Sequence, residues 1–178
     1  MFYTLVMCFW LGIFPSTLNE EIPYNSQKPL EWTDFSQRIG GGGLYKAFSY
    51  TGIRYVVDAP DGKNVKIEVI PYFIPLKSWV HKDFKKPELL NHEQRHFDLT
   101  AIHAGMLDSV LRPYEVDVAS FMDQKLNLAV EAKFDSIYSL LEAAQDRYDK
   151  ETNHSTVVEK QEEWNFRIDS LKLIHLRW

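Results

Sequence analysis

One short run constrains this chain more than any other feature, the residues His92-Glu93-Gln94-Arg95-His96. On a helix, side chains four positions apart lie on the same face, so the imidazoles of His92 and His96 can both reach one ion. Glu93 lies beside the first of them, where its carboxylate can reach a water on that ion without binding the ion. Two histidines, an open metal position and a carboxylate base are the set that zinc-dependent hydrolases use. The run therefore predicts a helix that carries a metal site.

The sequence around this run favours a long helix. Pro87 and Glu88 suit a first turn, because that turn needs no proline N–H and its positive dipole end attracts a carboxylate. Pro113 is expected to stop the helix, which we predict to span Glu88 to Leu111. Its apolar residues recur at helical spacing: Leu89, Leu90, Phe97, Ile102, Met106 and Leu107.

The order of the other predicted elements indicates an α+β fold. Residues 53–57 and 65–69 are β-rich and flank the turn-forming residues 58–62, which predicts an antiparallel hairpin. A second helix is predicted to begin near Glu115, and a third to follow a break at residues 151–155. Because strands come first, we expect an N-terminal antiparallel β-sheet packed on a C-terminal helical part that carries the motif helix.

The composition limits the kinds of partner. Of the 178 residues, 45% are hydrophobic and 25% are charged, which is ordinary for a globular protein with a core. The net charge is −5, and the lysines and arginines form no patch along the sequence, which argues against nucleic acid as a partner. The short basic stretch of Lys82, Lys85 and Lys86 is typical of a solvated loop. No pattern in the sequence indicates an oligomeric state.

The first residues differ from the rest of the chain. Residues 2–14 are almost wholly apolar, a stretch too short for a transmembrane helix but suited to a signal peptide. We therefore expect residues 1–17 to be removed on export, which leaves a single secreted or periplasmic domain at residues 18–178 with no stable membrane span. The alternative is a buried N-terminal strand or helix. Cys8 is the only cysteine, so the exported domain would have neither disulfides nor thiolate ligands.

A catalytic zinc usually takes three protein ligands and keeps a fourth position for water, so a third ligand must come from elsewhere in the chain. His103 lies on the same helical face as His96 but about 10 Å further along the axis, which favours a packing role. Glu115, at the predicted start of the next helix, also suits the positive end of that helix. His81 lies in a loop before the motif. His154 lies at the break between two helices, where it can turn towards a facing helix.

Four blocks of sequence occur in the order found in one family. They are Trp32-Thr33-Asp34-Phe35, Ser78-Trp79-Val80, Leu89 to Asp98 with the motif inside it, and Tyr148-Asp149 followed by Glu151-Thr152-Asn153-His154. With these blocks the chain resembles the predicted secreted zinc-dependent proteases of bacteria known as domain of unknown function 922, over about residues 30 to 170. The resemblance implies a zincin-like domain with Zn²⁺ held by His92, His96 and His154. The family usually has Gly after the last histidine, where this chain has Ser155.

The chain is then expected to be a zinc-dependent hydrolase that cleaves a peptide or protein substrate in the bacterial envelope. Glu93 would take a proton from the attacking water and deliver it to the leaving amine. Tyr148, close to His154 in the sequence, is a candidate donor to the oxyanion, although a tyrosine at this point of a helix also suits the core. Asp98 and Asp149 are candidates for orienting the ligand histidines, and Asp98 points away from the motif face on an ideal helix.

Two other interpretations are kept open. A zincin scaffold can hold zinc without turnover and serve as an envelope adaptor or binding module, although a purely structural zinc needs no base such as Glu93. The histidines can also be incidental in a metal-free helical domain. Metal content separates the metal-free domain from the two zinc-binding interpretations, and hydrolysis separates an enzyme from an adaptor. The strand at residues 65–70 can pair with an extended peptide substrate if it lies at the edge of the sheet.

Overall fold

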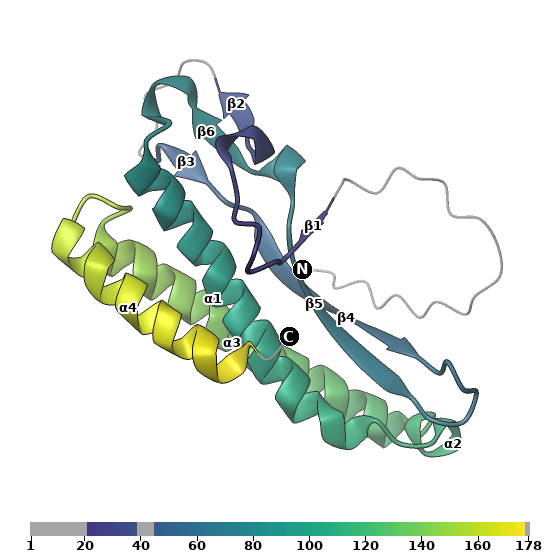
Figure 1. The fold of residues 1–178 in the computed structure, drawn as a ribbon. Helices are drawn as coiled ribbons and strands as arrows, with labels where there is room; N and C mark the ends of the chain where they lie inside the picture. Colours follow the sequence, from purple (N-terminus) through teal and green to yellow (C-terminus); the bar gives the residue numbers. More distant parts are fainter. Residues whose placement is uncertain (1–20, 39–44, 177–178) are drawn as a thin grey trace.

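The computed structural model describes residues 21–38 and 45–176. Strands occupy the first half of this part and helices the second, which confirms the α+β expectation (Figure 1). The predicted export segment at residues 1–17, with Cys8, lies outside the described residues. Export and a domain boundary at residue 18 therefore stay predictions. None of the described helices is both long enough and apolar enough to span a membrane.

The predicted hairpin is present and longer than expected. β4 (Thr51–Asp58) and β5 (Lys66–Phe73) pair in antiparallel register along their whole length. In the turn between them, the Asp61 carboxylate accepts two backbone hydrogen bonds, and Gly62 has a φ of 64°, which favours glycine. β1 (Ile22–Pro23) pairs with the far end of β5, so the strand order of this sheet is β1-β5-β4.

A second, smaller sheet lies at one end of the molecule, close to the start of the motif helix (Figure 1). β6 (Trp79–His81) is its middle strand, parallel to β2 (Ser36–Arg38) and antiparallel to β3 (Ala47–Phe48). Val80 is fully buried while its two neighbours in β6 are only half-buried, because successive side chains of a strand face opposite sides. One face of the sheet therefore covers a core, and the other faces outward.

The motif helix matches its prediction closely. α1 spans Pro87–Leu111, with Pro87 in the first turn as expected. It ends at a 3-10 turn, Arg112–Tyr114, that contains Pro113. Gly105 of α1 marks a close approach to the last helix, because a Cβ at this position would overlap the backbone carbonyl of His175.

The second helix begins later than predicted. Instead of one helix from near Glu115, the chain forms a single turn, α2 (Val118–Phe121), and then the long α3 (Gln124–Thr152). The physical reason is two N-caps, because the carboxylates of Asp117 and Asp123 accept hydrogen bonds from backbone N–H groups of the following turns.

The last two helices are joined by the break that the sequence predicted. α4 (Val158–His175) follows a turn at residues 153–157. The hairpin β4–β5 packs on one side of α1, and α3 and α4 pack on another (Figure 1). A second apolar cluster joins the small sheet to the first turns of α1; its members include Phe35, Phe73, Val80, Leu89 and Phe97. The motif residues lie in this first part of α1, between the two clusters.

Candidate metal centre

Two histidines of α1 lie one turn apart and face the same point, as the sequence predicted. His92 is 2% exposed, and the side chain of His96 is 13% exposed. Their Nε2 atoms lie 3.2 Å apart, and the two rings meet edge to face with centroids 4.8 Å apart. The helix therefore brings two ring nitrogens to one place while it keeps most of both rings away from solvent.

A carboxylate from α3 meets these two nitrogens. Asp149 Oδ1 lies 3.0 Å from His92 Nε2 and 2.9 Å from His96 Nε2. Burial opposes ionisation of Asp149, but histidines protonated at Nε2 would donate to it, and these hydrogen bonds hold the pKa of this carboxyl well below its ordinary value. These three groups offer ligand atoms that all lie within 4.8 Å of one another. Asp149, which the sequence suggested only as an orienting group, is thus placed to be a ligand.

The far side of His92 is fixed by a chain of side-chain hydrogen bonds. Arg95 Nε can only donate, and it lies 3.1 Å from Asn165 Oδ1. This oxygen also accepts from Gln161 Nε2 at 3.0 Å, so Gln161 turns its Oε1 towards His92 Nδ1, 3.0 Å away. His92 Nδ1 must then carry the proton, which leaves a lone pair on His92 Nε2.

The same logic fixes His96 from α3. Gln145 Nε2 donates to the backbone carbonyl of His96 at 2.9 Å, and a carbonyl can only accept. The Oε1 atom of Gln145 therefore accepts a hydrogen bond from His96 Nδ1. The lone pair of His96 Nε2 then points towards Asp149. Burial lowers the pKa of His96, but when Nε2 takes up a proton it donates to Asp149, and this hydrogen bond and the carboxylate charge outweigh burial and raise the pKa above its ordinary value.

When both histidines are unprotonated at Nε2, the lone pairs of three atoms face one another with no N–H group between them. The two Nε2 atoms and Asp149 Oδ1 are separated by 3.2, 3.0 and 2.9 Å, which is repulsive unless a cation lies among them. Tetrahedral zinc holds such atoms at about 2.0–2.2 Å, so its ligand atoms lie roughly 3.3 Å apart. Imidazole and carboxylate are also groups that zinc takes as ligands. These three ligand atoms therefore fit a divalent metal. Protonation of a histidine is the other way to place a positive charge between them.

His154 approaches the same carboxylate from the turn after α3. Its Nδ1 lies 3.2 Å from Asp149 Oδ1, and its side chain is 35% exposed. The turn holds three consecutive residues in left-handed backbone conformation, with φ of 44° at Asn153, 52° at His154 and 71° at Ser155. A φ of this sign favours glycine, so glycine would adopt this conformation at Ser155 with less strain than serine. The sequence correctly placed His154 beside the centre, and its ligation stays a prediction.

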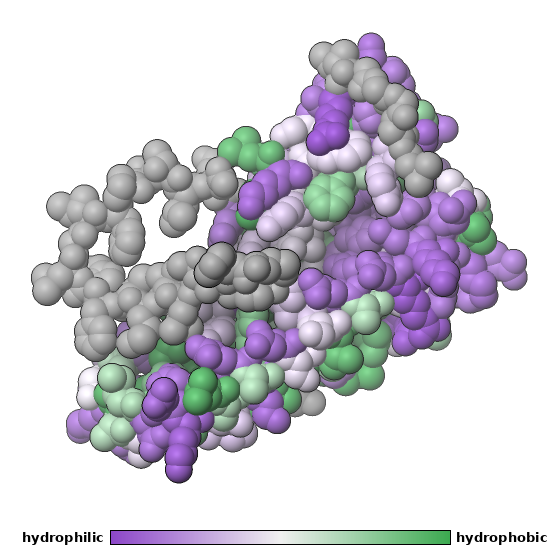
Figure 2. Space-filling model, turned by 180° about the vertical axis from the view of Figure 1, so that it is seen from behind, coloured by the Kyte–Doolittle hydropathy of each residue, from purple (hydrophilic) through white to green (hydrophobic). Residues whose placement is uncertain are grey.

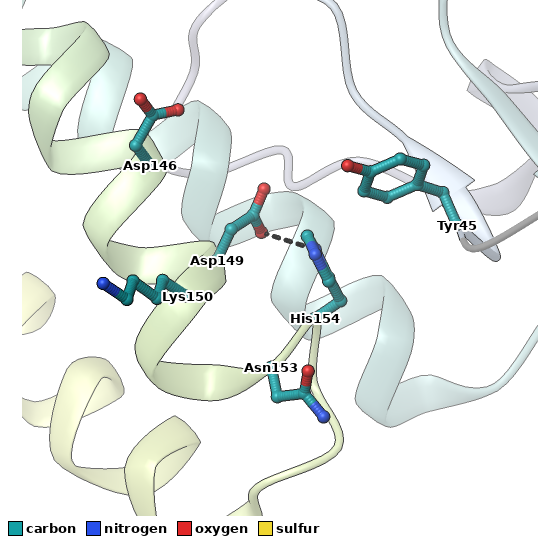
Figure 3. Close-up of a pocket in the computed structure, with 6 residues that line it drawn as sticks. All are labelled: Tyr45, Asp146, Asp149, Lys150, Asn153 and His154. Carbon is teal, nitrogen blue, oxygen red and sulfur yellow. Dashed lines mark ion pairs between the residues drawn. The ribbon is translucent and has the colours of Figure 1, made fainter.

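A polar pocket opens beside His154. It has a volume of about 410 Å³ and is lined by Tyr45, Asp146, Asp149, Lys150, Asn153 and His154. Figure 3 shows Asp149 and His154 pointing towards each other, with Tyr45 on the opposite side of His154. The Tyr45 ring meets the His154 ring edge to face, with centroids 4.9 Å apart. The pocket gives solvent and ligands access to the exposed side of the centre.

Glu93 is buried beside the two histidines and is held by a residue that the sequence did not single out. Ser49, which follows β3, donates its hydroxyl to Glu93 Oε2 at 2.6 Å. The negative charge of Glu93 helps to raise the pKa of His96. Glu93 is therefore close enough to influence the centre electrostatically, and one of its carboxylate oxygens has a fixed partner.

Tyr148 lies in the core rather than in the pocket. It is fully buried, and its ring stacks on His92 with centroids 4.6 Å apart. Its hydroxyl donates to the backbone carbonyl of His92 and accepts from Gln161 Nε2. Burial raises the pKa of this hydroxyl above its ordinary value. A catalytic role for Tyr148 stays a prediction, and this geometry favours a positioning role, because the hydroxyl already has two protein partners.

The other sequence candidates lie away from the centre. Glu115 accepts a hydrogen bond from the backbone of Ile67 in β5, and His103 donates to the Leu99 carbonyl inside the core. His81 belongs to β6.

Asp98 is buried under a different set of donors: Tyr24, Gln94, Arg95 and Lys172. β5 is the middle strand of its sheet, and Ile67 and the residues just before β5, 63–65, bond to residues 115–118. The condition for pairing with a substrate, that residues 65–70 lie at the sheet edge, is therefore not met.

Sequence reasoning found Asp149 as a supporting residue but missed Gln145, Gln161 and Ser49. Gln145 and Asp149 are four positions apart on α3, a spacing that could have marked a polar stripe facing the motif helix. Gln161 and Ser49 carry no such signal, because each reaches the centre from a segment far away in sequence.

Comparison with known proteins agrees with the family resemblance over part of the chain. Residues 77–155 match the model of the family described as "Bacterial protein of unknown function (DUF922)". The matched region contains both motif histidines, Glu93, Asp149 and His154, while Ser49 and Gln161 lie outside it. No curated protein and no solved structure matches the chain.

Proposed function

We propose that this chain, whose residues 77–155 are a DUF922 region, is a zinc-dependent hydrolase that cleaves peptide bonds of a protein or peptide in the bacterial envelope. One observation carries the proposal. Three lone pairs, on His92, His96 and Asp149, meet within 3.2 Å of one another, and hydrogen bonds to the opposite ring nitrogens fix both histidines in the tautomer that a metal requires.

His92, His96 and Asp149 would hold the ion. When bound, Zn²⁺ would polarise the substrate carbonyl and lower the pKa of a water to about 7. Other side chains of the protein hold these ligands in place. Gln161 and Gln145 orient the two rings, and the stacked ring of Tyr148 prevents His92 from turning.

Glu93 is the proposed general base. Ser49 binds Oε2 of its carboxylate, which leaves Oε1 to accept a proton from the attacking water and later to give it to the leaving amine. Burial of Glu93 favours this exchange, because the carboxylate has little competing water around it. Positioned proton transfer of this kind typically contributes about 10²–10⁴-fold to the rate.

The position of His154 favours a second candidate function, a zinc-binding adaptor without turnover. His154 lies 3.2 Å from the Asp149 oxygen that also meets the two motif histidines. If His154 and Asp149 both bind, the ion has four protein ligands, and such closed sites are usually structural. If only one of them binds, a position stays open for water. The number of protein ligands therefore separates the enzyme from the adaptor.

The first experiment measures the metal. Protein purified without added metal is analysed for zinc, and the Co²⁺-substituted protein is examined by absorption spectroscopy and by water-proton relaxation. We expect one ion per chain with an exchangeable water. His103→Ala is the matched control, because His103 lies on the same helix and its Nδ1 donates to the Leu99 carbonyl instead of facing the centre. An ion without exchangeable water would support the adaptor, and a wild-type protein that binds neither metal would contradict both functions.

The second experiment measures hydrolysis. Wild type and Glu93→Gln are loaded with equal zinc and incubated with a broad peptide library and with an unfolded protein. We expect cleavage by the wild type and a loss of about 10²–10⁴-fold in the variant. Equal rates in the two proteins would mean that Glu93 is not the base. Absence of cleavage by zinc-loaded wild type would turn the assignment towards the adaptor.

A further inference from the structure

The outward face of the small sheet carries a continuous set of aromatic rings. Phe48 of β3 lies opposite Trp79 of β6, and their rings stack with centroids 6.4 Å apart. The His81 ring meets the Trp79 ring edge to face with centroids 5.3 Å apart, and the Phe84 ring meets the His81 ring edge to face with centroids 6.5 Å apart. Tyr50 extends the set beyond Phe48, again at 6.5 Å. Phe48 is 46% exposed and Phe84 is 36% exposed, so much of this apolar surface meets solvent.

Three cations from separate parts of the sequence stand over these rings. Each has its charged group within 4.5 Å of a ring centroid: Arg38 over Trp79, Lys46 over Phe84 and Lys77 over Tyr50. Among the residues that the structure describes, none of the three pairs with a carboxylate. The face therefore presents positive charge that the protein itself does not neutralise.

The neighbouring residues add apolar surface and charge of the same sign. Leu76, beside Lys77, is 70% exposed. Lys82, Lys85 and Lys86 follow β6 directly, and Asp83 is the only acidic residue between Leu76 and Pro87. Residues 76–86 hold four lysines and one acidic residue, whereas the whole chain has a net charge of −5, and Glu31 and Asp34 before β2 offset only part of this positive charge. The view from behind in Figure 2 shows hydrophobic side chains in small groups among hydrophilic ones.

We propose that the outward face of the sheet β2-β6-β3 docks on an anionic lipid surface. Exposed rings and an exposed aliphatic side chain beside lysines and an arginine are the chemistry of an interfacial membrane contact, with the rings at headgroup level and the cations on lipid phosphates. A ligand that binds by stacking, such as a base or a sugar, fits this face less well, because a cation already covers one face of each of three rings. Leu76 offers such a ligand neither stacking nor a hydrogen bond.

Docking in this way would orient the candidate metal centre. Tyr45, which lines the pocket, and Ser49, which binds Glu93, flank β3 on its two sides in sequence. The acidic remainder of the chain would be repelled by the same lipid, so the basic face alone would lead the approach. The inference does not rest on hydrolysis or on metal, because the face and the centre use different side chains.

The test is co-sedimentation of the full chain with two kinds of vesicle, phosphatidylcholine alone and phosphatidylcholine with an equal part of phosphatidylglycerol. We expect binding to the anionic vesicles that weakens with salt. The triple variant Arg38→Gln, Lys46→Gln, Lys77→Gln should bind about 100-fold more weakly, since one cation near such a surface contributes about five-fold. Its matched control, Lys28→Gln, Lys125→Gln, Lys133→Gln, makes the same change of charge at exposed positions elsewhere and should lose much less.

A second pair of variants separates a lipid surface from a soluble polyanion. Leu76→Ser with Phe84→Ser should weaken vesicle binding but leave binding of a polyphosphate unchanged. The apolar residues 2–14 are common to all variants, so differences between them report on the face. Equal losses in the triple variant and its control, or no effect of Leu76→Ser with Phe84→Ser, would overturn the proposal. Unchanged circular dichroism and thermal unfolding would show that each variant is folded.

Discussion

The half of the candidate metal centre on α1 and the half supplied by the end of α3 and the turn after it differ in how firmly they are held. His92 and His96 lie on a regular helix, are largely buried, and have their second ring nitrogens bound by Gln161 and Gln145. His154 is 35% exposed and belongs to a turn with three left-handed residues, a conformation that costs roughly 1–3 kcal/mol for His154 and Ser155 and less for Asn153. Asp149 belongs to α3, and its Oδ1 lies close to ring nitrogens of both halves, those of His92 and His96 on α1 and that of His154 in the turn.

This difference predicts which ligands dominate metal affinity. A preorganised ligand residue loses little conformational freedom when the metal binds, so His92, His96 and Asp149 should contribute most to zinc affinity. His154 should contribute less, because part of its binding free energy offsets the strain of its turn. The family resemblance alone predicts the opposite order for the last two residues, with His154 essential and Asp149 in support. The two expectations can be separated experimentally.

The largest expected effect is the loss of a ligand. Asp149→Asn keeps the size of the side chain but removes its charge, and we expect zinc affinity to fall by more than about 100-fold, beyond the range seen for supporting residues. His154→Ala should weaken binding less. Calorimetric titration of both variants with zinc gives the order. If His154→Ala loses more affinity than Asp149→Asn, the turn and not α3 supplies the third ligand.

The next effect concerns the residue that fixes the tautomer of His92. Gln161→Leu removes the acceptor from His92 Nδ1, and zinc affinity should fall by about 10–100-fold. Gln124→Leu makes the same substitution at the exposed first residue of α3 and serves as the control. Zinc titrations of the two variants are compared at a temperature at which thermal unfolding shows both to be folded. Equal affinities would mean that the α1 half is preorganised by packing alone.

A smaller effect is expected from pH. In the metal-free protein the raised pKa of His96 means that its pairing with Asp149 stabilises the fold below about pH 6.5, and that this stabilisation is lost as the pH rises through the folded-state pKa. Zinc needs unprotonated imidazole, so its affinity rises over the same interval by up to about ten-fold per unit for each proton displaced. The rise in Tm on adding zinc should therefore be small near pH 5.5 and large near pH 8. An increment that does not change with pH would argue against the histidines as ligands.

The smallest effect tests the strain in the turn. Ser155→Gly places glycine where φ is 71°, and we expect the free energy of unfolding to rise by about 1 kcal/mol, or Tm by roughly 2–4 °C. Asn153→Gly should change less, because asparagine tolerates this conformation at a helix end. Thermal unfolding of both metal-free variants measures the difference. Destabilisation by Ser155→Gly would show that the serine side chain matters more than the backbone conformation.

The sequence by itself determined the local elements of this protein and half of its candidate site. The apolar spacing around His92 and His96 and the flanking prolines defined α1 almost to the residue, because helix periodicity and termination depend on near neighbours. The hairpin followed from two β-rich segments and a turn with Asp61 and Gly62 for the same reason. The start of the second helix was misplaced because two capping aspartates compete there, and local pattern alone does not rank them.

Only the tertiary structure decided what completes the site. Asp149 meets His96 across 53 positions of sequence, and Gln161 meets His92 across 69, so neither contact leaves a periodic signal. The same holds for the row of rings and cations on β2, β3 and β6, whose members look like isolated residues until strand pairing brings them together. Local pattern determines which face a side chain takes on its own element, whereas the packing of distant elements determines which side chains it meets.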